Sequence, residues 1–483
     1  MPSPCLRRAT LVAIALACCA AVSGQAWAPG ESPGQRTAAH LARIKGDAAA
    51  LRAFLRAMPK GADLHNHLTG AVYAESYIRW AAELDLCVDL RTSTIVETCR
   101  DAETQKPASD VLANPRIFRD LVDAMSTRHW RERGAIGHYQ FFDTFPKFNA
   151  LTRIERADSA EMSGRFVAEV VERAALQNVL HVELMMALTA GALAERPDTS
   201  WESDEVFGTL RDRMLAAGLR QRVSERLAWL DRVERHARML LGCGTATPKA
   251  GCDVSVRYIA YAHRGQPPET VYAQAVFAFE LAAADPRVAG VNLVMPEDWH
   301  VPMRDYDLHM RMFRALRLVR PSVPVSLHAG ELALGLVPPE SLGLHVRRAV
   351  EVGGARRIGH ATDVMNDVDP AGLMREMARK GIAVEVSLTS SDVILGVRGS
   401  RHPLRQLLHA GVPVALSTDD EGVSRTDLTN EYQRAVEEHG LTYAEIKTIS
   451  RNSIDHSFLP DETRTRLRRQ LEADFQKFEA RYR

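Results

Sequence analysis

One stretch near the start of the chain reads Lys60-Gly61-Ala62-Asp63-Leu64-His65-Asn66-His67-Leu68-Thr69-Gly70 and holds two histidines separated by a single residue. Alternate side chains of a β-strand lie on the same face, so the imidazoles of His65 and His67 are expected to point the same way. Two imidazoles that converge at a strand end are half of a typical zinc site. Two unrelated polar residues in a turn would look the same, so the rest of the chain must supply the missing ligands.

Helical and strand patterns alternate through the chain from about residue 160. The predicted strands that follow the His65 strand cover 179–186, 254–262, 288–294, 323–328, 356–360, 382–387 and 412–418. Eight strands with helices between them predict an α/β fold, a (β/α)8 TIM-type barrel that occupies residues 29–482 as a single domain. A helical extension over 36–58 precedes it. A doubly wound open sheet is the alternative, but no glycine-rich phosphate loop follows the first strand.

Polar side chains stand where the later predicted strands end. They are His328, Glu331, His360, Ser390, Asp419 and Asp420. A barrel brings its strand ends to one rim, where active sites lie. Three imidazoles and one carboxylate with an open position suit a catalytic zinc ion, and we predict one Zn²⁺ per chain. The predicted ligands are His65, His67, His328 and Asp419, although these residue types would also hold iron or cobalt.

Three neighbours of these ligands are candidates for the chemistry. Glu331 lies just beyond His328 and is placed to give a proton to a substrate. His360 has no ligand role in this scheme and is placed to orient or deprotonate a water activated by the metal. Asp420 follows a ligand directly and is placed to hydrogen-bond a substrate nitrogen.

Composition excludes some partners and is otherwise ordinary. Of the 483 residues, 46% are hydrophobic and 25% are charged, which is usual for a globular protein. The 61 basic and 61 acidic side chains give a formal net charge of zero, so neither nucleic acid nor an anionic membrane surface is expected as a partner. No segment after residue 28 is apolar for long enough to form a stable membrane span.

Residues 1–28 have the features of a secretory signal peptide. Two arginines precede the apolar run Leu11–Val22, and Ala26-Trp27-Ala28 places small residues at a cleavage site. A short membrane anchor, or a lipoprotein signal at Cys18, is the weaker alternative. We therefore expect an exported protein, either periplasmic or secreted.

Four of the seven cysteines remain after the predicted cleavage. They form two sequence-local pairs, and we predict Cys87–Cys99 and Cys243–Cys252 disulfides in an oxidising compartment. Four cysteines allow three connectivities, and sequence proximity is the only argument for this one. The first bridge would staple residues 83–112, a polar stretch that reads as an insertion after the first strand.

The motifs, taken together and in order, resemble the adenosine deaminase family. The similarity covers roughly residues 36–475 and rests on the opening stretch above and on five later ones: Leu327-His328-Ala329-Gly330-Glu331, Arg357-Ile358-Gly359-His360, Glu385-Val386-Ser387-Leu388-Thr389-Ser390, His402-Pro403-Leu404 and the run from Ser417-Thr418-Asp419-Asp420 to Tyr432. The insertion makes the chain most similar to the secreted, growth-factor-like branch.

This resemblance implies hydrolytic deamination at C6 of adenosine or a closely related 6-aminopurine nucleoside, giving inosine and ammonia. It implies that the four predicted ligands hold zinc and that Glu331 protonates purine N1. It also implies that His360 steers the hydroxide and that Asp420 contacts N7.

Some positions depart from the family pattern. Met295 and Pro296 replace a glycine-containing stretch at the end of the fourth strand, Met185 stands in place of an arginine, and Glu421 stands in place of a proline. Met295 would crowd the approach to the purine, so we predict that it contacts the substrate, together with Asp420 and Ser390. A related amidohydrolase that acts on a modified adenine nucleoside or another aminated heterocycle is the alternative, and a non-catalytic binding protein is a third reading.

A second possible metal motif lies in the second predicted strand. His181-Val182-Glu183 matches the His-x-Glu of the cytidine and tRNA deaminases. That class also needs a downstream Pro-Cys-x-x-Cys, which this chain lacks. We therefore interpret these residues as part of a strand.

Overall fold

The computed structural model describes residues 31–153, 159–198 and 200–482. The predicted signal peptide at 1–28 lies outside these residues. Among the described residues, no helix is both long and apolar enough to span a bilayer.

Two four-stranded parallel sheets form the centre of the described chain. The first contains β1 (Gly61–His67), β5 (Val179–Met186), β6 (Ser255–His263) and β7 (Val288–Val294), in that order. The second has the order β11-β10-β9-β8, with bounds Val414–Leu416, Ala383–Val386, Arg357–His360 and Ser326–Ala329. These eight strands coincide with the eight predicted from the sequence. Because each sheet is parallel, the carboxyl ends of its strands lie at one edge.

Backbone contacts join the two sheets at both of their outer edges. The Asp419 amide donates to the His65 carbonyl (2.8 Å), and the His67 amide donates to the Asp419 carbonyl (3.0 Å). At the other edge the Val291 amide donates to the Pro324 carbonyl (3.1 Å). The chain therefore has an α/β fold built on two parallel sheets, in which the end of β1 lies directly beside the segment that follows β11.

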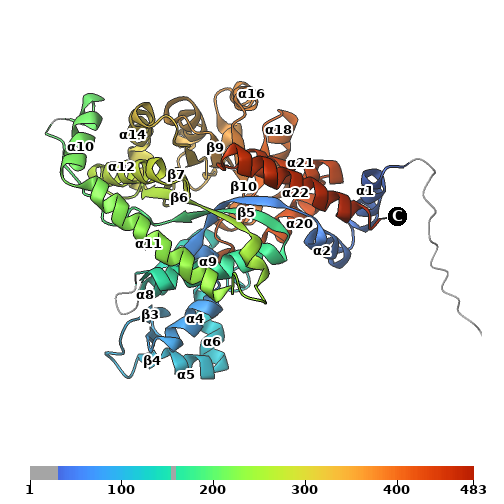
Figure 1. Cartoon of the computed structure of the whole chain (residues 1–483), viewed down its shortest axis with the longest axis horizontal. Helices are drawn as coiled ribbons and strands as arrows, with labels where there is room; N and C mark the ends of the chain where they lie inside the picture. The colour runs from blue at the N-terminus through green and yellow to red at the C-terminus, as the bar shows by residue number, and fades with distance from the viewer. Residues whose placement is uncertain (1–30, 154–158, 199, 483) are drawn as a thin grey trace, which may run out of the picture.

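Helices connect the strands and cover the sheets (Figure 1). The longer connecting helices are α9 (Ser159–Leu176), α10 (Glu205–Ala216), α11 (Leu219–Leu240), α12 (Pro268–Ala284), α14 (Tyr306–Val319), α16 (Pro370–Lys380) and α17 (Leu388–Leu395). Four helices follow β11: α19 (Glu421–Ser424), α20 (Leu428–His439), α21 (Tyr443–Asp455) and α22 (Asp461–Glu479). α12 is apolar on nearly all sides and is accordingly buried along most of its length.

The predicted helix over 36–58 is two helices in the structure. α1 (Pro33–Ile44) and α2 (Ala48–Ala57) are separated by a short break, and the Asp47 side chain accepts hydrogen bonds from the Ala49 and Ala50 amides as the N-cap of α2. The sequence prediction missed this break because the apolar spacing continues through it. The Phe54 ring of α2 packs against the Phe478 ring of α22 at 5.0 Å.

The segment after β1 contains the predicted insertion. It begins with α3 (Leu68–Ala71) and α4 (Ala74–Glu83) and continues into a small antiparallel sheet of order β3-β2-β4, formed by Thr94–Val96, Cys87–Asp89 and Gln105–Pro107. α5 (Ala108–Ala113) and α6 (Pro115–Ala124) follow. The sequence did not predict this small sheet, and the interpretation of residues 83–112 as an insertion stays a prediction.

Both predicted cysteine pairs lie at bonding distance. The sulfurs of Cys87 and Cys99 are 2.05 Å apart, and those of Cys243 and Cys252 are 1.98 Å apart. The first pair closes the small sheet of the insertion. The second joins the end of α11 to the segment that leads into β6.

Candidate metal centre and active site

The four predicted metal ligands converge at one place. One ligand atom each from His65, His67, His328 and Asp419 lies within 4.8 Å of all the others. His67 Nε2 is 3.1 Å from His328 Nε2 and 3.3 Å from Asp419 Oδ1. His65 Nε2 is 3.4 Å from the same carboxylate oxygen. The ends of β1 and β8 and the segment that follows β11 therefore come together, as the sequence predicted.

The hydrogen-bond partners of the histidines make this site suitable for a divalent cation. His65 Nδ1 lies 2.7 Å from Glu385 Oε2, and His328 Nδ1 lies 3.0 Å from Asn292 Oδ1. When Nδ1–H donates to such an acceptor, the Nε2 lone pair faces the centre and is free to bind a metal. His65 Nε2 is buried and has no hydrogen-bond partner among the described residues. This set of three imidazoles and one carboxylate matches the donors that zinc prefers.

Asp419 is held in an uncommon conformation. Its φ of +59° lies in the left-handed region, which a residue with a side chain seldom adopts. The two backbone hydrogen bonds to β1 fix this geometry. The Ser390 hydroxyl donates to Asp419 Oδ2 (2.6 Å), so Ser390 lies beside a predicted ligand, and its contact with substrate stays a prediction.

Glu331 and His360 lie together beside the four ligands. His360 Nε2 is 3.7 Å from Glu331 Oε1, and one atom of each residue lies within 4.8 Å of Asp419. Burial, together with the charges of Asp419 and Glu297, raises the pKa of Glu331 well above its usual value. Burial lowers the pKa of His360 to about 4. These shifts favour the protonated form of the Glu331 carboxyl and the neutral form of the His360 imidazole.

Asp420 packs against the glycine that ends the opening motif. A Cβ added at Gly70 would lie 1.5 Å from Asp420 Oδ1, so no larger residue fits there. Asp420 Oδ1 is buried and has no hydrogen-bond partner among the described residues. Burial and the charge of Asp419 raise the pKa of Asp420 well above its usual value. The protonated form of this carboxyl is therefore favoured, and its Oδ1 is available to a ligand that enters the site.

Glu297 supports the turn that carries Glu331, and the sequence analysis assigned it no role. Its two carboxylate oxygens accept hydrogen bonds from the Gly330 amide (3.0 Å) and the Glu331 amide (2.8 Å). His345 Nδ1 hydrogen-bonds the same carboxylate, and the Arg264 guanidinium lies 3.9 Å away. Although burial opposes it, the charge of Arg264 and the contact with His345 lower the pKa of Glu297 to about 2. Glu297 therefore stays ionised, and both of its carboxylate oxygens accept hydrogen bonds from the turn.

A buried chain of charges extends from His65 into the interior. The guanidinium of Arg357 hydrogen-bonds the Glu385 carboxylate that contacts His65, and it also donates to Glu183 Oε2 (2.5 Å). Burial favours the neutral carboxyl, but the charge of Arg357 lowers the pKa of Glu183 to about 2. Glu183 thus serves as an ion-pair partner within β5, in agreement with the interpretation of His181-Val182-Glu183 as part of a strand. The signal in the sequence that points to these buried ion pairs is the presence of charged residues within strands that are otherwise apolar.

Methionines lie where the sequence departs from the family pattern. Met295 has a φ of +95°, a left-handed value that glycine adopts without strain. Its carbonyl accepts a hydrogen bond from Arg264 Nε (2.8 Å). Met185 Sδ lies 3.4 Å from Asn292 Nδ2, and Asn292 contacts His328. Met185 therefore contacts a residue that supports His328, whereas the contact of Met295 with substrate stays a prediction.

A family model described as adenosine deaminase matches residues 135–474, which is more than half of the chain. The chain belongs to the adenosine deaminase family. The matched region contains His328, Glu331, His360 and Asp419, and it begins after β1. The assignment to the growth-factor-like branch stays a prediction.

Relatives at the sequence level are deaminases of two kinds. The chain is 32% identical over 229 residues to an adenine deaminase from Rhizobium leguminosarum bv. trifolii, an alignment that covers 47% of this chain and 64% of that protein. It is 36% identical over 154 residues to an adenosine deaminase from Lacticaseibacillus paracasei, covering 32% and 42% of the two chains. The chain thus spans less than two thirds of the length of either relative.

Solved structures share the fold over most of the chain. An amidohydrolase from Burkholderia ambifaria with bound Zn matches with a TM-score of 0.59 at 21% identity, covering 89% of this chain and 94% of that one. The Arabidopsis N6-mAMP deaminase matches with a TM-score of 0.55 at 21% identity, covering 87% and 99%. At this level of identity the similarity shows the fold alone.

Proposed function

We propose that this protein removes the C6 amino group of adenosine, or of a closely related 6-aminopurine nucleoside, by hydrolysis. One water is consumed, and the products are inosine and ammonia when the substrate is adenosine. The observation that carries the proposal is the meeting of His65, His67, His328 and Asp419 with Glu331 and His360 in one buried cluster. A purely structural role would not require so many titratable groups at one set of strand ends.

The four ligands would hold one divalent cation, and we propose zinc. When bound, such a cation acts as a Lewis acid and brings the pKa of water toward neutrality. The donor set and the bound Zn of the Burkholderia amidohydrolase support this choice. Elemental analysis of the purified protein distinguishes zinc from iron and cobalt.

The chain's own residues supply the proton transfers and the substrate contacts. The protonated carboxyl of Glu331 donates to purine N1, which makes C6 more electrophilic. The neutral imidazole of His360 accepts a proton from the attacking water. The carboxyl of Asp420 donates a hydrogen bond to purine N7. The directions in which burial shifts the pKa values of Glu331, His360 and Asp420 support these roles.

A modified adenine nucleoside or another aminated heterocycle is the second candidate substrate. Met295 and Pro296 motivate it, because they depart from the family pattern at the end of the fourth strand. The matched relatives also include an adenine deaminase and an N6-mAMP deaminase. The two candidates share the hydrolytic chemistry and differ in the group beside the purine C6 or at N9.

An activity screen of the purified protein tests the proposal. The panel contains adenosine, adenine, AMP, N6-methylated adenosine, a pterin and a cyclic amide. We expect the protein to convert adenosine to inosine. This activity should be lost when a chelator removes the metal and restored when Zn²⁺ is added. Higher activity on a non-purine than on any purine would favour the alternative amidohydrolase. Absence of turnover on the whole panel, with substoichiometric metal, would favour the non-catalytic reading.

Glu331→Gln tests the proton donor directly. The amide keeps the shape of the side chain but cannot give up a proton, so kcat should fall by about 10²- to 10⁴-fold. Metal content should stay at the wild-type level. Turnover equal to that of the wild type would show that Glu331 is not the donor.

We further infer that the two sheets close into one (β/α)8 barrel and that residues 29–482 form one exported domain. Backbone hydrogen bonds at both sheet edges support closure. The apolar run before residue 28 and the two cysteine pairs support export. N-terminal sequencing of the protein from the extracytoplasmic fraction should find the mature chain beginning at Pro29, and an intact Met1 there would contradict cleavage.

A further inference from the structure

Arg173, on the outer helix α9, contacts both segments that leave the candidate metal centre. Its Nε donates to Glu421 Oε1 (2.6 Å), and one of its Nη atoms donates to the Ala71 carbonyl. Ala71 ends α3, the helix that follows His67 directly, while Glu421 begins α19, which follows Asp420 directly. One guanidinium thus joins the chain beyond the His-x-His strand to the chain beyond the Asp-Asp pair.

These two segments lie in close contact with little room for adjustment. Asp420 packs on Gly70, and a Cβ added at Gly422 would lie 2.2 Å from the Val72 carbonyl oxygen. The strained φ of Asp419 persists only while its surroundings hold it. A shift of α19 relative to α3 would therefore move Asp419 away from the histidines of β1.

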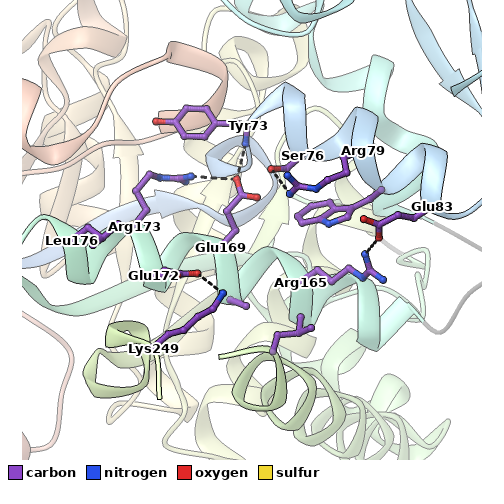
Figure 2. A pocket seen from close by; sticks show the side chains of 13 residues that line it. Tyr73, Ser76, Arg79, Glu83, Arg165, Glu169, Glu172, Arg173, Leu176 and Lys249 are labelled. Carbon is purple, nitrogen blue, oxygen red and sulfur yellow. Dashed lines mark hydrogen bonds and ion pairs between the residues drawn. The ribbon is translucent and has the colours of Figure 1, made fainter. Parts of the chain in front are cut away.

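The opposite side of Arg173 faces a cavity on the outside of the fold, of about 700 Å³, bordered by α4 and α9. Figure 2 shows Glu169 between the Tyr73 amide and Arg173, at hydrogen-bond distances of 3.1 and 3.3 Å. The Arg173 guanidinium also lies 4.3 Å from the centre of the Tyr73 ring. Glu169 and Tyr73 thus contact Arg173 on the side of the cavity, while its other nitrogens donate to Glu421 and Ala71.

Other ion pairs line the same cavity without reaching the metal centre. Lys249 Nζ lies 3.0 Å from Glu172 Oε2, and Arg165 pairs with Glu83 (Figure 2). Glu172 is the residue before Arg173 on the same helix. It therefore provides a matched control for the loss of a charge from this surface.

We propose that Arg173 is a positioning residue that fixes Asp419 and Asp420 relative to His65 and His67 through its bonds to Glu421 and Ala71. The proposal rests on the proposed function in taking these residues as the metal and substrate groups. Arginine suits the task because its planar fork serves several acceptors at once, which the single ammonium of lysine cannot do in the same geometry. The pair also explains the use of Glu421, which supplies an acceptor that proline lacks.

Zinc affinity of the purified full chain tests this proposal. The variants are Arg173→Lys and Glu421→Gln, with Glu172→Gln as the control, and the dissociation constant for Zn²⁺ is measured by competition with a chromophoric chelator. Support residues of metal ligands typically change affinity by about 10- to 100-fold, and we expect about 10-fold weaker binding in the first two variants. The control should bind Zn²⁺ as the wild type does. The double variant Arg173→Lys with Glu421→Gln should bind Zn²⁺ no more weakly than the weaker of the two single variants.

The outcomes separate this proposal from the proposed function. Wild-type zinc affinity in both Arg173→Lys and Glu421→Gln would overturn the positioning role, even if their thermal midpoints fall. If Arg173→Lys does not fold, the conservative Glu421→Gln variant decides alone. A wild-type protein that binds zinc tightly but deaminates nothing would overturn the proposed function, while the affinity comparison would still test Arg173.

Discussion

Gly70 shows how one residue without a side chain shapes the site. Asp420 occupies the space that a Cβ at this position would fill, so the opening motif and the Asp-Asp pair fit together only with glycine here. The backbone of Gly70 needs no unusual φ. Its identity is therefore set by a close approach and not by conformation.

Gly70→Ala should displace Asp420 and lower kcat/KM for the substrate by about 100-fold or more, since small misplacements at an active site have effects of this size. Zinc content should fall as well, because Asp420 directly follows the predicted ligand Asp419 and the two segments pack with little room for adjustment. Steady-state kinetics and metal analysis measure the two effects. Gly46→Ala is the control, since a Cβ at Gly46 meets nothing within 4 Å, and equal losses in both variants would contradict the packing argument.

At the scale of elements, the turns after β7 and β8 act as one unit. Glu297 follows β7, and both of its oxygens bind amides of the turn after β8. Arg264, which follows β6, adds hydrogen bonds to the Met295 and His328 carbonyls (2.8 and 3.1 Å). Three successive strand ends are thus held by one buried group of charges.

Glu297→Gln should lower kcat with little change in KM, because an amide offers one acceptor where the carboxylate offers two. Loss of one such support typically costs about 10- to 100-fold in activity. Asp298→Asn is a suitable control, since Asp298 Oδ1 contacts His138 Nε2 (3.2 Å) outside this group. A kcat unchanged in Glu297→Gln would show that the turn holds Glu331 without this carboxylate.

Over the whole molecule, the pattern of strands and the polar strand ends were predictable from the sequence. The alternation of helical and strand patterns located all eight strands of the two sheets, and His65, His67, His328 and Asp419 meet as expected. Contacts across the fold were not predictable, because Glu297, Arg357 and Arg173 act on residues far from them in sequence. The break between α1 and α2 was missed for a local reason, the continuing apolar spacing.

The buried pair of Glu183 and Arg357 makes overall stability depend on pH. The pKa of Glu183 is about 2 in the folded protein, below its value of 4.5 in an unfolded chain. The ionised carboxylate therefore stabilises the fold fully above about pH 4.5, and this contribution is lost as the pH falls toward 2, with a size of about 3 kcal/mol.

Glu183→Gln should lower the urea midpoint at pH 7, and the difference from the wild type should shrink as the pH falls from 5 to 3. Unfolding followed by far-UV circular dichroism measures both proteins. Glu172→Gln removes a carboxylate from an exposed ion pair on α9. Its urea midpoint should show no such pH-dependent difference from that of the wild type. If the difference in urea midpoint between the two proteins stays constant across this pH range, the charge of Glu183 is not the source of its stabilising effect.

The hydrogen bonds between the end of β1 and Asp419 also set an order of events during synthesis. A growing chain presents His65 and His67 early, but their carboxylate partner emerges only with the last strand. Until then, the ribosome-bound chain offers an incoming ion two nitrogens and later a third. We therefore expect the proposed metal site to be filled only after the last strand has joined the fold, as one of the final steps in the maturation of this protein.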